Sequence, residues 1–236
     1  MPEHAVVRRE EWEEARKNLL EEEQQGAGSS TVLLLTGAAV AWVVTVERMR
    51  GMDSGPGVGL GGWEWYLGVW VAMTAAMMLP TALPAAHFAR VRRASPAILF
   101  AAAYLAVWTA FGIAAYALFR NELDTGIVAA VVVAAGIYEL TPLKQRSLRR
   151  CRSRHGSNTA FRSGLAHGFD CVGCSGGLMV VLIVLGLMSL LWMVVVAAAI
   201  FAEKVLPKGP RVSPVIAAGL VALGIWLAVS PESIPS

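Results

Sequence analysis

Charged residues are scarce in this chain. Only 16% of the 236 residues are Asp, Glu, Lys or Arg, whereas 56% are hydrophobic, a balance that is unusual for a soluble protein. Cysteines number only three and lack the paired pattern of a secreted disulfide scaffold. Signatures of serine hydrolases, kinases and phosphate-binding loops are missing as well. These absences exclude an ordinary soluble domain and several common enzyme classes.

What the chain does contain is a series of apolar runs of about 17 to 25 residues, the length that crosses a hydrocarbon core of roughly 30 Å. We predict an all-α, polytopic transmembrane helix bundle of about seven spans. The longest uncharged run, residues 171–202, would measure roughly 48 Å as one helix, so we expect it to form a hairpin of two spans. The predicted spans are 31–46, 66–87, 96–118, 127–143, a hairpin that begins near 164 and turns at 186–189, and 212–229.

The bundle, residues 31–229, is expected to follow an acidic segment at the N-terminus. Residues 1–30 include seven glutamates and four basic residues between positions 5 and 25, a composition that favours an amphipathic helix in the cytoplasm. No small-residue cleavage site follows the first apolar run, which starts near Thr31, so we expect this span to be retained. Residues 230–236 form a short C-terminal tail.

The distribution of basic residues predicts the orientation. With the N-terminus in the cytoplasm and the C-terminus outside, 17 of the 20 Lys and Arg residues lie in cytoplasmic segments, as the positive-inside rule requires. Seven of them belong to residues 144–162, which we interpret as a cytoplasmic loop rather than a nucleic-acid patch. The predicted location is the bacterial inner (cytoplasmic) membrane, as a multi-pass protein.

A row of polar side chains opens the predicted hairpin. His167, Asp170, Cys171 and Cys174 are spaced i, i+3, i+4 and i+7, so a helix places all four on one face. Thiolate and imidazole are ligands that select Cu(I) and Zn(II), and an unpaired aspartate within the membrane would cost about 3 kcal/mol. The row is therefore a candidate metal site in the cytoplasmic half of the bundle.

Other candidate ligands reach the same half of the membrane. They are Met77, Met78 and His87 in the second predicted span, Glu139 near the end of the fourth, and Cys151 with His155 just after it. Each also has a structural interpretation. The methionines can pack in the core, His87 can extend to the interface, and Glu139 can pair with Lys144. Cys171 and Cys174 can be inert buried thiols, and the glycines from Gly164 to Gly177 can serve only close helix packing.

Several of these motifs occur together in one family. Met77-Met78-Leu79-Pro80, Tyr138 to Lys144, Cys151-Arg152, His167-Gly168, Cys171-Val172-Gly173-Cys174, Leu191-Trp192-Met193 and Glu203-Lys204 resemble, in this order, a bacterial family of predicted metal-binding integral membrane proteins. The resemblance implies a multi-span fold and a transition-metal site, with copper first. The family pattern carries a further cysteine where Ser147 stands and another where Ser175 stands.

Three functional hypotheses follow. The first is a membrane protein that binds a soft transition metal, Cu(I) before Zn(II), for transport or for delivery to another membrane complex. The second is a thiol oxidoreductase that uses Cys171 and Cys174, although the pair would face the reducing side of the membrane. The third is a structural subunit without metal. Lipids are expected neighbours, a partner complex or a homo-oligomer stays open, and no nucleic acid is expected.

Overall fold

The computed structural model describes residues 16–17, 31–49, 60–88, 94–153, 159–186, 189–206 and 209–230. Helices dominate these ranges and no strand occurs in them, which confirms the all-α prediction. The predicted N-terminal segment, apart from residues 16–17, and residues 231–236 of the tail lie outside the described part. After a helix at Thr31–Met49 come α2 (Trp63–Phe88), α3 (Ala94–Phe119), α4 (Thr125–Leu140), α5 (Pro142–Arg152), α6 (Ala160–Gly186), α7 (Leu190–Val205), the 3-10 turn η1 (Gly209–Arg211) and α8 (Ser213–Val229).

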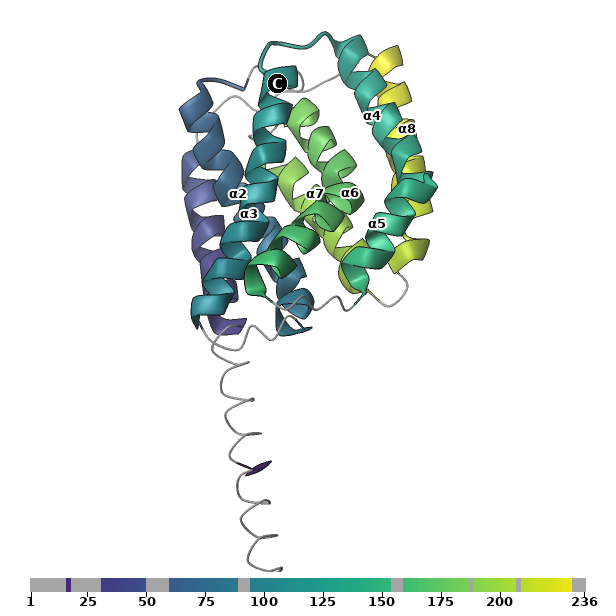
Figure 1. Cartoon of the computed structure of the whole chain (residues 1–236). Coiled ribbons are helices and arrows are strands. Elements are labelled where there is room, and N and C mark those ends of the chain that lie inside the picture. Colours follow the sequence, from purple (N-terminus) through teal and green to yellow (C-terminus); the bar gives the residue numbers. More distant parts are fainter. Residues whose placement is uncertain are drawn as a thin grey trace, which may run out of the picture.

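The helices form a bundle in which α6 and α7 lie between the pair α2 and α3 and the pair α4 and α8 (Figure 1). Two aromatic side chains of α2 anchor it to α3. Trp70 donates a hydrogen bond from Nε1 to the carbonyl of Trp108 over 2.9 Å, and Tyr66 donates one to the carbonyl of Gly112 over 3.1 Å. These bonds satisfy the polar ends of two buried rings whose apolar bodies fill the core.

The uncharged run divides where the hairpin prediction put its turn. Helix α6 ends at Gly186, whose φ of 120° is open to glycine but strained for other residues. Ser189 then caps α7, with its hydroxyl accepting a hydrogen bond from the Trp192 backbone amide over 3.5 Å. A left-handed glycine followed by a serine cap therefore ends one helix and starts the next.

Fewer helices reach the length needed to cross a membrane than the seven spans predicted from the sequence. Within the described ranges, four helices are long and apolar enough to cross, namely Thr31–Met49, Trp63–Leu83, Ser95–Phe119 and Ala160–Gly186, and α4 with α5 makes a fifth if this bent pair counts as one span. The count differs from seven because α7 and α8 have only 16 and 17 residues. At 1.5 Å per residue they measure about 25 Å, less than a full hydrocarbon core.

The basic segment after α4 differs from the expected solvated loop. Residues 142–152 form helix α5, which is bent by 64° from α4. Thr141 makes the break, since its extended backbone caps α5 and Pro142 supplies a first helical residue without an N–H. Lys144 on this helix is 0% exposed. The bend turns it into the protein, away from water.

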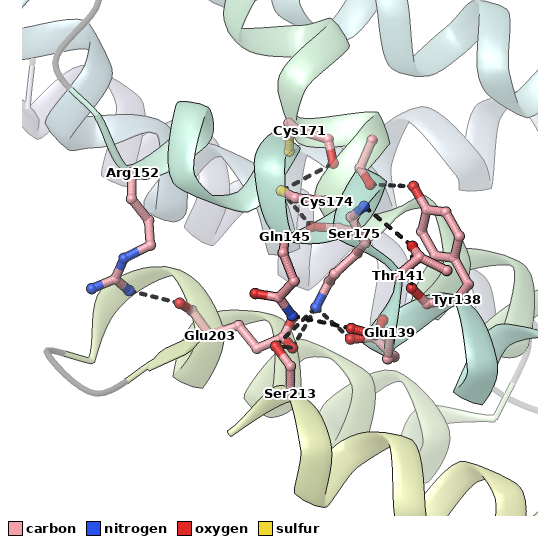
Figure 2. A network of polar contacts seen from close by, with 12 residues as sticks. Tyr138, Glu139, Thr141, Gln145, Arg152, Cys171, Cys174, Ser175, Glu203 and Ser213 are labelled. Carbon is pink, nitrogen blue, oxygen red and sulfur yellow. Dashed lines mark hydrogen bonds and ion pairs between the residues drawn. The ribbon is translucent and has the colours of Figure 1, made fainter. Parts of the chain in front are cut away.

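Lys144 is bonded to side chains from three other helices. Its ammonium group pairs with the carboxylates of Glu139 on α4 and Glu203 on α7, the second at 2.5 Å, and donates to the Ser213 hydroxyl on α8 at 3.2 Å. Ser213 in turn donates to Glu203 over 2.6 Å. Figure 2 shows Glu139, Glu203 and Ser213 converging at this point. This lysine network, as we call it, fixes α5 against the bundle.

Close helix packing depends on glycines at the contacts. A Cβ atom on Gly164 of α6 would collide with the backbone carbonyl of Phe100 on α3, and one on Gly168 would lie 3.0 Å from Val107. Between α4 and α8, Gly136 and Gly224 have equally close neighbours. Small residues let helix backbones approach in this way, so the packing role of Gly164 and Gly168 is confirmed.

A glycine at a close helix contact and a glycine with open space around it should respond in opposite ways to an added methyl group. We expect Gly164→Ala to destabilise the protein by about 1 to 3 kcal/mol, because backbone lies where the new Cβ would be. Gly219→Ala is the matched control, since nothing lies within 4 Å of its added Cβ and alanine favours a helix by up to about 1 kcal/mol. Thermal unfolding of the purified variants measures both. Equal unfolding temperatures would contradict the close contact.

Breaking the lysine network should lower the free energy of unfolding by more than the removal of a surface charge does. We expect Lys144→Met to destabilise by about 3 to 5 kcal/mol, because two buried carboxylates lose their counter-charge. Arg150→Met on the exposed side of the same helix should change stability by less than about 0.5 kcal/mol. The triple variant Lys144→Met, Glu139→Gln, Glu203→Gln should recover part of the loss in the same thermal assay. No recovery would show that lysine packing, not charge, holds the helices.

Candidate metal centre

All three cysteines of the chain gather at one place. Cys171 and Cys174 lie one turn apart on α6, and Cys151 reaches them from the last turn of α5. The three Sγ atoms lie within 4.8 Å of one another, and all three thiols are free. Cys171 and Cys174 are buried while Cys151 is partly exposed. Of the ligands proposed from the sequence, these three come together.

The bend between α4 and α5 is what brings Cys151 to this place. Helix α5 runs across α6 so closely that a Cβ on Gly173 would lie 2.6 Å from the Ser147 hydroxyl. Tyr138, at the end of α4, donates a hydrogen bond to the Gly173 carbonyl over 2.6 Å. At the far end of α5, Arg152 donates to the last carbonyls of α7, those of Glu203 at 2.6 Å and Lys204 at 2.8 Å. Both ends of α5 are therefore fixed next to the thiols.

Polar groups from α3 and α7 contact the thiol of Cys171. The hydroxyl of Tyr104 lies 2.9 Å from Sγ, and the Lys204 ammonium group donates to the same sulfur over 2.8 Å. Cys174 has its own neighbours on α6, because its thiol donates to the Cys171 carbonyl and lies 3.4 Å from the Ser175 hydroxyl. Figure 2 shows these two α6 contacts.

The two methionine candidates are both buried on α2. Met78 lies beside the cysteines, since its Sδ atom is 3.7 Å from the Lys204 ammonium group that also contacts Cys171. Met77 and Met78 both belong to the hydrophobic core around α2, in agreement with their interpretation as packing residues. One thioether is therefore placed near the thiols, and it is that of Met78.

Three other candidates do not join the three-thiol group. His167 stacks on aromatic rings of α3, with ring centroids 5.6 Å from Tyr104 and 6.2 Å from Phe100, and Asp170 is half-buried one residue before Cys171. Glu139 belongs to the lysine network, so the alternative in which it pairs with Lys144 is confirmed. The side chain of His87, and all of His155, lie outside the part of the chain that the structure describes.

Sequence reasoning missed Lys204 and Tyr104 as neighbours of the site. In the sequence, Lys204 is one of the basic residues of a predicted cytoplasmic loop. Tyr104 lies in an apolar run, and no motif distinguishes it from its neighbours. The available signal was the position of Glu203 and Lys204 in the last turn of an apolar helix, where both charges are expensive unless they have partners. The partners of Glu203 come from α5 and α8, and those of Lys204 from α6 and α2.

The donor set suits a soft metal ion. A metal–sulfur distance of about 2.3 Å places three sulfurs in a plane about 4 Å apart, so a small rotation of the side chains would bring these thiols onto one ion. Thiolate sulfur selects Cu(I), Zn(II) and iron–sulfur clusters among biological metals. The three cysteines are therefore the residues that would hold a metal.

Comparison with known proteins gives one result. The family model PpoB2, described as a copper chaperone, matches residues 67–227. We found no match to the chain among curated proteins and none among solved structures. The matched region runs from α2 to α8 and includes all three cysteines and the lysine network. The chain therefore belongs to the PpoB2 copper chaperone family.

Proposed function

We propose that this protein binds Cu(I) at Cys151, Cys171 and Cys174 and delivers it to another protein. The observation that carries the proposal is that the three Sγ atoms lie within 4.8 Å of one another. They come from two helices, α5 and α6. The bend from α4 and the hydrogen bonds of Arg152 to the end of α7 hold α5 in place. Inert thiols would not require this arrangement. The membership of the chain in a family described as a copper chaperone supports copper as the cargo.

The surroundings favour Cu(I) over Zn(II). Structural zinc sites are almost always closed by four ligands, whereas three thiols make up the group among the residues that the structure describes. The Met78 thioether contacts the same ammonium group as Cys171, and thioether sulfur adds to a preference for copper. Lys204 and Tyr104 contact Cys171 on its remaining sides, and neither supplies the imidazole or carboxylate that zinc commonly takes.

Delivery requires that the ion leave the site again. Cys171 and Cys174 are buried in α6, whereas Cys151 is partly exposed at the end of α5. We propose that Cys151 is the ligand through which copper enters and leaves, because an acceptor can reach it first. A chain of ligand exchanges between sulfur atoms moves the ion without releasing it into water. The acceptor would carry soft ligands of its own, in a membrane complex or in a second copy of the chain.

We further propose that the bundle lies in a bacterial cytoplasmic membrane as about seven spans, with α7 and α8 as short ones. Large apolar side chains support this, since Leu118, Leu191, Val215 and Val229 are more than two thirds exposed, which is costly in water. The distribution of basic residues supports an N-terminus in the cytoplasm and a C-terminus outside. Reporter fusions at both ends test this topology, and a C-terminal reporter active in the cytoplasm would contradict it.

Removal of the thiols should remove the metal. We expect the purified protein to hold about one Cu(I) per chain, and Cys171→Ser or Cys174→Ser to lower its Cu(I) affinity by at least tenfold, because each removes a direct ligand. Cys151→Ser should weaken binding less and slow the transfer of copper to a soluble chelator. Metal analysis and chelator competition measure the two effects. Ser147→Ala is the control, because Ser147 lies on the same helix as Cys151, faces Gly173 of α6 and offers no strong ligand.

Other outcomes point to the alternative functions. Equal copper content in the wild type and in a variant that lacks all three cysteines would contradict the proposal. A disulfide among these cysteines in the protein as isolated, without metal, would favour the thiol oxidoreductase. A stoichiometric partner that co-purifies with metal-free protein would favour the structural subunit.

A further inference from the structure

The ammonium group of the partly buried Lys204 has an unusual position for a positive charge. It donates to Cys171 Sγ at 2.8 Å and lies 3.7 Å from Met78 Sδ, so its neighbours are sulfur atoms on α6 and α2. The adjacent residue, Glu203, is turned the other way and pairs with Lys144. Two successive residues of α7 therefore serve two different clusters, and the positive charge of Lys204 is directed at the thiols.

This position has two physical consequences for an ion held by the thiols. The first is steric, because the ammonium group contacts both Cys171 Sγ and the Met78 thioether and takes up room beside the thiols that a further ligand would need. The second is electrostatic, because repulsion between charges scales with their product. At the same distance, Lys204 opposes a divalent cation twice as strongly as a monovalent one. Both effects disfavour an ion that needs four ligands and carries two charges.

We propose that Lys204 determines the metal specificity of the three-cysteine site, by excluding zinc in favour of a monovalent ion of low coordination number. The inference rests on the proposed copper site and adds to it a selectivity residue that does not itself bind the metal. It also explains why a lysine is directed at a cluster of soft ligands: the charge makes the site poor for Zn(II), which would otherwise compete for thiolate sulfur.

The experiment compares the affinities for Cu(I) and for Zn(II), each ion added alone to the metal-free, full-length protein in competition with a chromophoric chelator. Lys204→Leu and Lys204→Gln remove the charge, and Lys204→Arg retains it. Arg211→Gln is the matched control, because it removes an exposed cation on the neighbouring turn η1. We expect the neutral variants to shift the ratio of the two affinities toward zinc by at least about tenfold. Lys204→Arg and Arg211→Gln should keep the wild-type ratio.

The readout separates this inference from the proposed function. If the wild type binds Cu(I) through the cysteines but both neutral variants keep its ratio of affinities, Lys204 is not a specificity residue. An equal shift in Arg211→Gln would also overturn the inference, because the effect would then belong to the net charge of the region. If the wild type binds Cu(I) no better than its cysteine-free variant, the proposed function itself fails. Should Lys204→Leu not fold, Lys204→Gln alone decides.

Discussion

The ammonium group of Lys144 lies between two buried carboxylates, and the arrangement of four helices depends on that contact. Glu139 comes from α4, Glu203 from α7 and Ser213 from α8, while Lys144 itself comes from α5. A charge in the interior is tolerated only with partners of opposite sign, and the loss of one partner leaves the others uncompensated. The network therefore ties the bent helix α5 to a defined position, and the candidate metal centre is built on that position.

Helices α5 and α7 each carry one residue of the lysine network and one residue that lies at the candidate metal centre. On α5, Lys144 and Cys151 are seven residues apart, which is two turns on one face of the helix. Because Lys144 fixes the position of α5, it also fixes the position of the Cys151 thiol along α6. On α7, Glu203 and Lys204 follow one another, and each contacts a different one of the two clusters. Arg152 completes the link, since it binds the carbonyls of both residues at the end of α7. The thiols cannot separate without disturbing this set of contacts.

Glycines make the remaining geometry possible. Gly164 and Gly168 let α6 lie directly against α3, and Gly173 lets α5 cross α6 at the height of the cysteines. With side chains at these places the helix axes would move apart, and the thiols on α5 and α6 would separate with them. The same run of sequence that carries the ligands thus also carries the small residues that bring their helices together. The copper chaperone family to which the chain belongs matches this whole region.

The sequence by itself determined most of the helices, though not α5, and the three cysteines of the candidate site. Apolar runs predicted the helices because burial of apolar surface sets their length. The excess length of the uncharged run predicted the break at Gly186. The spacing of Cys171 and Cys174 placed both on one face of α6. The tertiary structure decided which donors belong together. It separated Glu139 from the thiols, packed His167 against the rings of α3, buried Lys144 and placed the partly buried Lys204 beside Cys171, although both lysines had been expected as loop charges. Local pattern cannot show this, because each outcome depends on a bend of 64° between two helices and on partners distant in the sequence.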